Sequence, residues 1–97
     1  MIVYQPSAEQ ELIDSAAYYE SNLEGLGEEF LTTIDHALDS IEESPLAYYF
    51  SHPEIDMRRY PVKRFPFFLY YRIGKDLIEI FAVAHQSKRP DYWIGRP

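Results

Sequence analysis

The fold is decided by residues 67–84, FFLYYRIGKDLIEIFAVA. Two β-rich apolar runs, residues 67–73 and 77–84, flank the turn at residues 74–76, a pattern that predicts a β-hairpin. The second run is the most apolar part of the chain, so we expect it to lie inside a sheet. Side chains alternate along a strand, which divides the first run into two sets, Phe67, Leu69 and Tyr71 against Phe68, Tyr70 and Arg72. One set should pack on helices, and the set with Arg72 should form an open face.

The segments on either side of this hairpin supply further elements. Residues 57–62 are predicted to form a strand, in which Pro61 cannot donate to a ladder and therefore indicates an edge or a bulge. Residues 45–56 are expected to be a loop. Residues 2–5 are β-rich and stop at a proline, which predicts a first strand. After the hairpin, residues 85–93 are expected to turn once as a short helix.

Two amphipathic helices are predicted between the first strand and the loop. Ser7 and Gln10 have the spacing of a capping box, which would begin the first helix. Gly25 is predicted to cap the C-terminus of that helix. The second helix begins near Leu26 and ends before Pro45, because the residue before a proline disfavours the α region. So short a link between two helices predicts an antiparallel helical hairpin.

The order of elements is therefore β-α-α-β-β-β. It predicts an α+β fold, in which the helical hairpin packs on a mostly antiparallel sheet. At 97 residues the chain has room for one core, so we expect residues 1–97 to form a single domain.

Composition excludes several classes of protein. The chain is 46% hydrophobic, which argues against disorder, and it lacks cysteine, which excludes a disulfide scaffold and thiolate metal sites. No apolar run approaches the ~20 residues of a membrane span, and no signal peptide is visible, so a cytoplasmic protein without membrane contact is expected. The three histidines share no spacing motif, so neither a metal site nor a cofactor is expected.

The net charge of -7 is unevenly distributed along the chain. Residues 1–57 carry thirteen acids and no Lys or Arg, whereas residues 58–97 carry all nine bases and only three acids. The two parts therefore have charges of -13 and +6. This asymmetry predicts a repelling acidic helical hairpin and a basic, aromatic sheet that attracts anionic partners.

Several stretches, in this order, resemble the RelE/ParE toxins of bacterial type II toxin–antitoxin modules. They are AAYYE at 16–20, GLGEEF at 25–30, RRYPVKRFPF at 58–67, LYYR at 69–72 and AVAHQSKRP at 82–90. The resemblance covers nearly the whole chain and is closer to the ParE, plasmid-stabilisation side of the family. It implies the RelE/ParE-like fold and a small cytoplasmic toxin that a cognate antitoxin, ParD-like or of another type II class, neutralises in a hetero-oligomer.

The resemblance leaves three functions open. ParE members typically cause growth arrest by poisoning DNA gyrase, whereas RelE members cut mRNA on the ribosome. A third alternative is a non-toxic member that serves only as an antitoxin-bound partner. Thirteen acids in the first 57 residues would repel the phosphates of ribosome and mRNA, which favours a gyrase-binding toxin that hydrolyses nothing.

The basic half supplies the residues expected to bind the antitoxin and the target. They are Arg58, Arg59, Lys63, Arg64, Arg72, Lys88, Arg89, Tyr92 and Trp93. Arg64 and Arg72 have an alternative structural use, as ion-pair partners of acids from the helices.

The RelE-like alternative requires a base, an acid and cations around a scissile phosphate. The candidates are His85 as base or acid, Arg64 and Arg72 as cations, and Tyr92 as a proton donor or stacking platform. Histidine is the side chain whose unperturbed charge change falls nearest neutral pH, so this residue type suits either role. Its structural alternative is a hydrogen bond that caps the end of the last strand.

Overall fold

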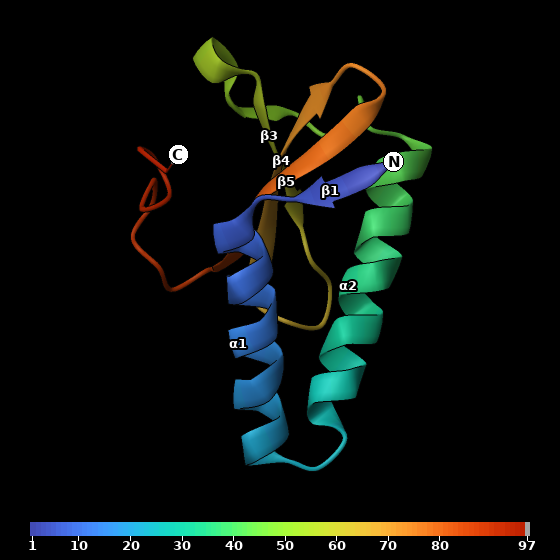
Figure 1. Ribbon diagram of the computed structural model, residues 1–97, viewed down its shortest axis with the longest axis vertical. Helices are drawn as coiled ribbons and strands as arrows, with labels where there is room; N and C mark the ends of the chain where they lie inside the picture. The colour runs from blue at the N-terminus through green and yellow to red at the C-terminus, as the bar shows by residue number, and fades with distance from the viewer. Residues whose placement is uncertain (97) are drawn as a thin grey trace.

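The computed structural model describes residues 1–96 and places two helices against a five-stranded sheet (Figure 1). In chain order the elements are β1 (Ile2–Tyr4), α1 (Pro6–Asn22), α2 (Leu26–Glu43), β2 (Phe50–His52), the single-turn 3-10 helix η1 (Pro53–Ile55), β3 (Met57–Pro61), β4 (Phe67–Gly74) and β5 (Leu77–His85). Neither helix of this part of the chain is long and apolar enough to cross a membrane.

The strand order in the sheet is β1-β5-β4-β3-β2. β1 runs parallel to β5, and the other neighbours are antiparallel. The predicted α+β architecture is therefore confirmed, and β5 lies inside the sheet as expected. Pro61 pairs with Phe68 of β4 beyond the end of the β2 pairing, so this proline occupies a local edge.

The prediction of a loop over residues 45–56 is wrong at β2 and η1. β2 is only three residues long, and its register with β3 is irregular between Phe50 and His52. So short a strand carries no alternating pattern, and it exists here because β3 supplies a partner for its backbone.

The predicted capping box at Ser7 is wrong. α1 begins at Pro6 with Gln5 as N-cap, and no side chain caps it. Proline suits the first helical position because it lacks the amide hydrogen that would be unpaired there and its φ is already helical. The side-chain amide of Gln10 donates instead to the carboxylate of Asp14, at 2.8 Å.

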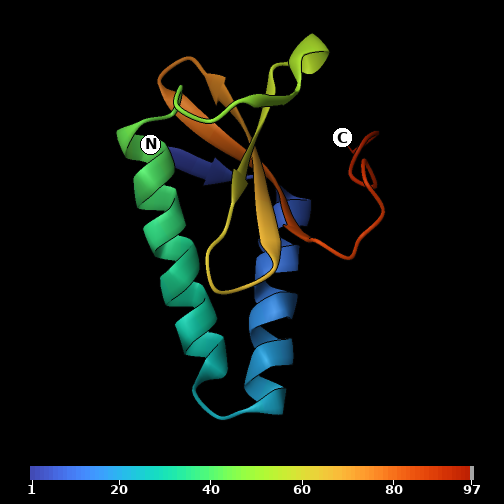
Figure 2. The same ribbon diagram turned by 180° about the vertical axis from the view of Figure 1, so that it is seen from behind.

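The link between the helices differs from expectation as well. Leu23 is the C-cap of α1, and Gly25, at φ 87°, is the N-cap of α2. Glu20 closes the link, because its carboxylate accepts the amides of Gly25 and Gly27, each at 3.0 Å. The helices touch here, since a Cβ on Gly27 would lie 2.6 Å from the backbone oxygen of Ala16. The predicted antiparallel hairpin forms, and it extends past the end of the sheet (Figures 1 and 2).

The main core lies between the helices and the sheet. The predicted set Phe67, Leu69 and Tyr71 of β4 is buried there, against Phe30 and Ile34 of α2. Aromatic contacts join Phe30 to Phe67, with ring centroids 5.0 Å apart. Each of these large side chains contributes roughly 1.5–3 kcal/mol on full burial, so this layer holds the helices to the sheet.

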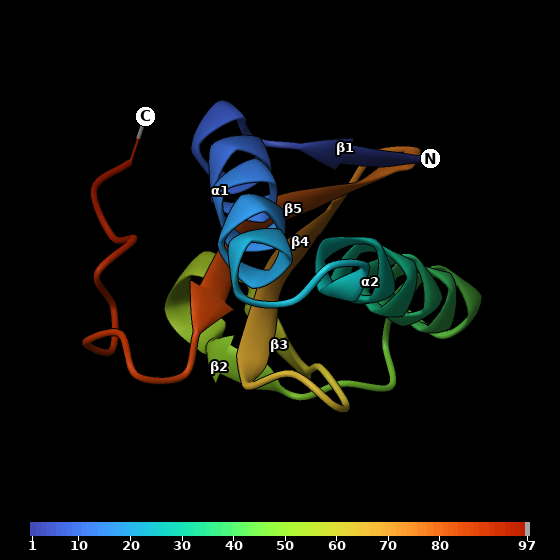
Figure 3. The same ribbon diagram turned by 90° about the horizontal axis from the view of Figure 1, so that it is seen from below.

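The other face of the sheet is not open as expected, because the tail, residues 86–96, crosses it. Trp93 is 1% exposed and packs with Tyr70 and Phe81 in a second cluster that includes Met57, Ala82 and Ala84. The tail consists of turns and not of the predicted short helix. Figure 3 shows the tail and α2 on opposite sides of β4 and β5.

Candidate functional site

A groove of about 90 Å³ lies where the tail meets the sheet. β3, β4 and β5 supply one wall, and the tail supplies the other. Its lining residues are Arg59, Phe68, Tyr70, Ala84, His85, Gln86, Lys88, Arg89, Pro90 and Tyr92. Three cations and no carboxylate line it, so this groove, which we call the basic groove, has the charge expected of a site for an anionic partner.

Aromatic rings hold two of these cations in place. β3 places Arg59 opposite Tyr70, and its guanidinium lies 4.2 Å from the centre of the Phe68 ring. Arg59 also donates to the hydroxyl of Tyr49 at 3.2 Å. Lys88 lies 5.5 Å from the centre of the Tyr92 ring. Cation–π contacts keep both charges while restricting their positions, which suits recognition of a charged surface.

His85 ends β5 and has the structural role that the sequence offered as an alternative. Its Nδ1 accepts the backbone amide of Ser87 at 3.0 Å, and its ring packs edge-on against Phe67 at 5.1 Å. Because an amide can only donate, Nδ1 carries a lone pair, and the neutral ring carries its proton on Nε2. The nitrogen that could accept a substrate proton is therefore already engaged.

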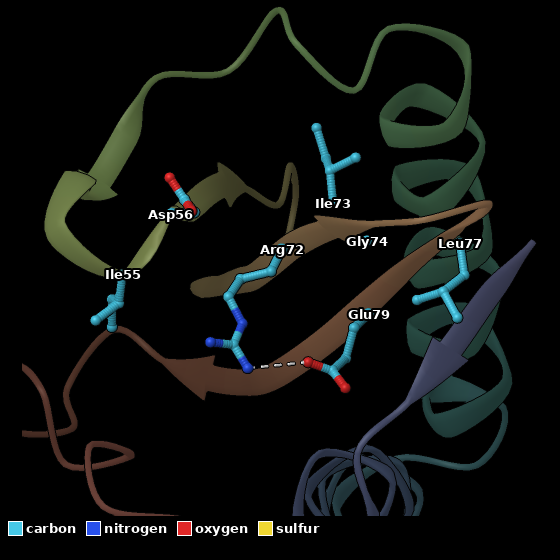
Figure 4. Close-up of a pocket in the computed structure, with 7 residues that line it drawn as sticks. All are labelled: Ile55, Asp56, Arg72, Ile73, Gly74, Leu77 and Glu79. Atoms are coloured by element: carbon cyan, nitrogen blue, oxygen red, sulfur yellow. Dashed lines mark hydrogen bonds and ion pairs between the residues drawn. The ribbon is translucent and has the colours of Figure 1, made fainter.

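Arg72 lies far from the basic groove, at the other end of β4. The register pairs Phe67 with His85 but Arg72 with Glu79, which places Arg72 and His85 about 17 Å apart along the strands. Arg72 forms an ion pair with Glu79 at 3.2 Å, at the rim of a separate cavity of about 340 Å³ (Figure 4). The expectation that its partner would come from a helix is wrong, because Glu79 belongs to β5.

The remaining predicted cations lie on other surfaces. Arg64 pairs with Glu29 of α2 at 2.8 Å, as its structural alternative predicted, and with Lys63 it lines a hollow beside α2. Arg58 donates to the carbonyl of Tyr48 at 2.6 Å and lies 4.1 Å from the centre of the Phe50 ring. The expected contact residues therefore do not form one surface, and the four candidates for an RNase site are not brought together.

Tyr92 and Trp93 also differ from expectation. Trp93 is buried, so it supports the tail and offers no surface for a partner. The hydroxyl of Tyr92 donates to the carboxylate of Glu11. Burial and, after it, this carboxylate raise the pKa of Tyr92 well above its ordinary range. A phenol in this state does not release its proton readily, which disfavours Tyr92 as a general acid.

Glu11 of α1 is the residue near this site that sequence reasoning missed. Its carboxylate accepts Arg96 at 2.7 and 3.1 Å and the backbone amide of Val83 at 3.0 Å, in addition to Tyr92. Glu11 is one of many acids in the helices, and nothing in the local sequence distinguishes it, because Val83 and Arg96 are distant in the sequence. Over residues 1–96, no three His, Asp or Glu side chains are grouped so that they could hold a metal ion.

Comparisons with known proteins bear on the whole chain. Residues 2–90 match the family described as the ParE toxin of type II toxin–antitoxin system, parDE. A solved structure, the chromosomal ParDE TA system from P. aeruginosa, superposes with a TM-score of 0.63 at 16% identity, over 87% of this chain and 92% of that chain. At that identity the likeness shows a shared fold. The curated protein sequences gave no match. Because the family match spans nearly all of its residues, this protein belongs to the ParE toxin family of type II toxin–antitoxin systems.

Proposed function

We propose that this toxin is neutralised by a cognate antitoxin that binds at the basic groove, and that the free toxin poisons DNA gyrase by binding to it. The observation that carries the proposal is the composition of the groove, in which Arg59, Lys88 and Arg89 surround aromatic rings and no carboxylate is present. Such a surface suits an acidic peptide segment, because complementary charge favours the encounter and excludes basic partners.

Exposed apolar side chains beside the groove support a protein partner. Tyr49, which hydrogen-bonds to Arg59, is 69% exposed, and Leu46 and Phe50 are exposed nearby in the chain. β2 is the last strand of the sheet, and its outer side has no partner strand in the described chain. A segment that adds to this edge and covers these side chains would combine backbone pairing with apolar burial.

Binding without hydrolysis is the reading that the placement of the charged residues favours. Cleavage of RNA at the 2′-OH needs a base, an acid and cations within contact distance of one phosphate. Here Arg72 lies about 17 Å from His85 along the strands, Arg64 pairs with Glu29 of α2, and Nδ1 of His85 accepts the amide of Ser87. These positions disfavour the RelE-like alternative.

Two assays on the wild-type toxin test the cellular target. In a supercoiling assay with purified DNA gyrase we expect dose-dependent loss of supercoiling, and on programmed ribosomes we expect no mRNA cleavage. Cleavage that His85→Ala abolishes without loss of folding would instead establish the RelE-like function. Expression without growth arrest would favour the non-toxic alternative.

A charge-reversal variant tests the antitoxin site. Lys88→Glu combined with Arg89→Glu places two carboxylates in the groove, and we expect co-purification with the cognate antitoxin to fall by about tenfold or more. Lys75→Glu is the matched control, since it reverses one exposed charge in the turn between β4 and β5, away from the groove. Equal antitoxin binding by the wild type, the double variant and Lys75→Glu would refute the groove as the antitoxin site.

A further inference from the structure

The tail is attached to the rest of the molecule on both sides of the sheet face that it crosses. On the β2 side, Nε2 of His52 lies 2.6 Å from the carboxylate of Asp91. On the α1 side, Tyr92 and Arg96 both meet Glu11. Trp93 lies between these two attachments and fills the second apolar cluster. The wall of the basic groove formed by residues 88–92 is therefore held against the sheet by Trp93 and attached on the β2 side and on the α1 side.

The attachment at Glu11 is the more extensive of the two. Arg96 meets the carboxylate with both terminal nitrogens, at 2.7 and 3.1 Å, in the two-point geometry that makes such pairs strong. The side chains of Arg96 and Glu11 are only 18% and 20% exposed, so water screens the pair poorly. The His52–Asp91 contact, by contrast, involves a half-exposed carboxylate.

Glu11 and Arg96 also form hydrogen bonds with backbone groups of β5 that lie beyond the end of its pairing with β1. β1 is short, and its pairing ends where the amide of Gln5 donates to Ile80. The register between β4 and β5 then skips Phe81. Past this point Glu11 accepts the amide of Val83 at 3.0 Å, and Arg96 donates to the carbonyl of Phe81 at 3.3 Å. The ion pair thus joins the tail to the backbone of β5 as well as to α1.

Packing of Trp93 on the sheet buries an unpaired polar group, and this penalty makes docking of the tail depend more on Glu11. Nε1 of Trp93 is buried and has no hydrogen-bond partner among the described residues. An unpaired buried donor opposes docking, because undocking would return it to water. The stabilisation that the docked tail gains from burial of the indole is therefore partly offset. The polar contacts on either side of Trp93 supply the further stabilisation that keeps the tail docked.

We propose that Glu11 is the positioning residue of the tail, so that a carboxylate from the acidic helices sets the geometry of the basic groove. Loss of Glu11 releases residues 88–96 from the sheet while the helices and strands stay folded. The consequence for partner binding rests on the proposed function, whereas the release of the tail does not.

Trp93 is the single tryptophan of the chain, and its fluorescence reports directly on docking. In Glu11→Ala we expect the emission to shift to the red and acrylamide quenching to increase, with the far-UV circular dichroism unchanged. Loss of hydrogen bonds to a charged group should raise the ratio of open to docked tail by about tenfold or more. Glu11→Gln keeps an acceptor for Val83 but loses the charge, so its quenching should lie between the wild type and Glu11→Ala.

The control is Glu9→Gln, which removes one exposed carboxylate from the same helix two residues away and should leave Trp93 unchanged. Arg96→Gln removes the same attachment from the tail and leaves α1 intact. It therefore tests whether this attachment docks the tail if Glu11→Ala lowers the far-UV circular dichroism of the helices. Trp93 emission and quenching that match the wild type in both Glu11→Gln and Arg96→Gln would overturn the proposal.

A second measurement connects the tail to binding. If the groove is the antitoxin site, Glu11→Ala should weaken antitoxin binding in proportion to the open fraction of the tail, while Glu9→Gln should not. Exposed Trp93 with antitoxin binding equal to that of the wild type would overturn the claim that Glu11 sets the groove. Failure of the proposed function is recognised separately, because Lys88→Glu with Arg89→Glu would then leave binding unchanged.

Discussion

Gly27→Ala should weaken the helical hairpin measurably. A Cβ at Gly27 would lie 2.6 Å from the backbone oxygen of Ala16 and 3.0 Å from Cβ of Glu20, and neither atom can move without its helix. The helices must separate locally by roughly 1 Å to restore ordinary contact. Overpacking of this kind costs roughly 1–3 kcal/mol, and the higher helix propensity of alanine returns up to about 1 kcal/mol. We therefore expect a net loss of about 1 kcal/mol in the free energy of unfolding.

Thermal and urea unfolding measure this loss. For a chain of this size, a loss of about 1 kcal/mol corresponds to a fall in Tm of roughly 4–8 °C. Gly74→Ala is the matched control, because its Cβ would meet only the flexible end of Leu77, at 3.3 Å, and its Tm should stay close to that of the wild type. A Tm of Gly27→Ala equal to or above that of Gly74→Ala would refute the close approach of α1 and α2 as a constraint.

Three further substitutions test individual contacts. Glu20→Gln weakens the cap on the first amides of α2 and should cost about 1 kcal/mol in urea unfolding; no change would mean that the cap contributes nothing. Tyr71→Phe removes the hydroxyl that donates to Pro45 at 2.7 Å and should cost about 1 kcal/mol at neutral pH. Burial raises the pKa of Tyr71 from 10.0 to about 12, so the stability of the wild type should fall as pH rises through this window. A loss of stability in Tyr71→Phe as large as that of the wild type over the same pH range would contradict that assignment. Arg64→Gln should change stability by less than about 0.5 kcal/mol, since Arg64 and Glu29 are 59% and 52% exposed, and a calorimetric loss above about 1 kcal/mol would contradict this.

The main elements of the fold could be predicted because their signals are local. The alternation in residues 67–73, the turn after them and the helical periodicity upstream each lie within one short window of sequence. β2 could not be predicted, since its pairing with β3 is created by the tertiary structure. The start of α1 was misassigned because a capping box at Ser7 and a proline at position 6 compete for the same turn, and the proline prevails.

The site was harder to predict because charge along a sequence does not determine charge on a surface. Arg58 and Arg59 are adjacent, but successive side chains of a strand point to opposite faces, so only Arg59 reaches the basic groove. Arg64, at φ 76°, lies after the strand and turns toward α2. Glu11 gave no signal, since its partners Val83 and Arg96 lie 72 and 85 positions away in the sequence.

The parallel pairing of β1 with β5 has a consequence for how the protein is made. Ile2 pairs with Ile78, so the first strand has no partner until β5 has been synthesised. The two helices contact each other through residues that are close in the sequence, so the hairpin can form early, whereas sheets that join distant segments form late. Chains that terminate before β5 therefore contain the hairpin but lack β5 and the tail, which supply Lys88 and Arg89 to the basic groove. Premature release during translation should yield a product that carries the acidic helices and only part of the proposed binding surface.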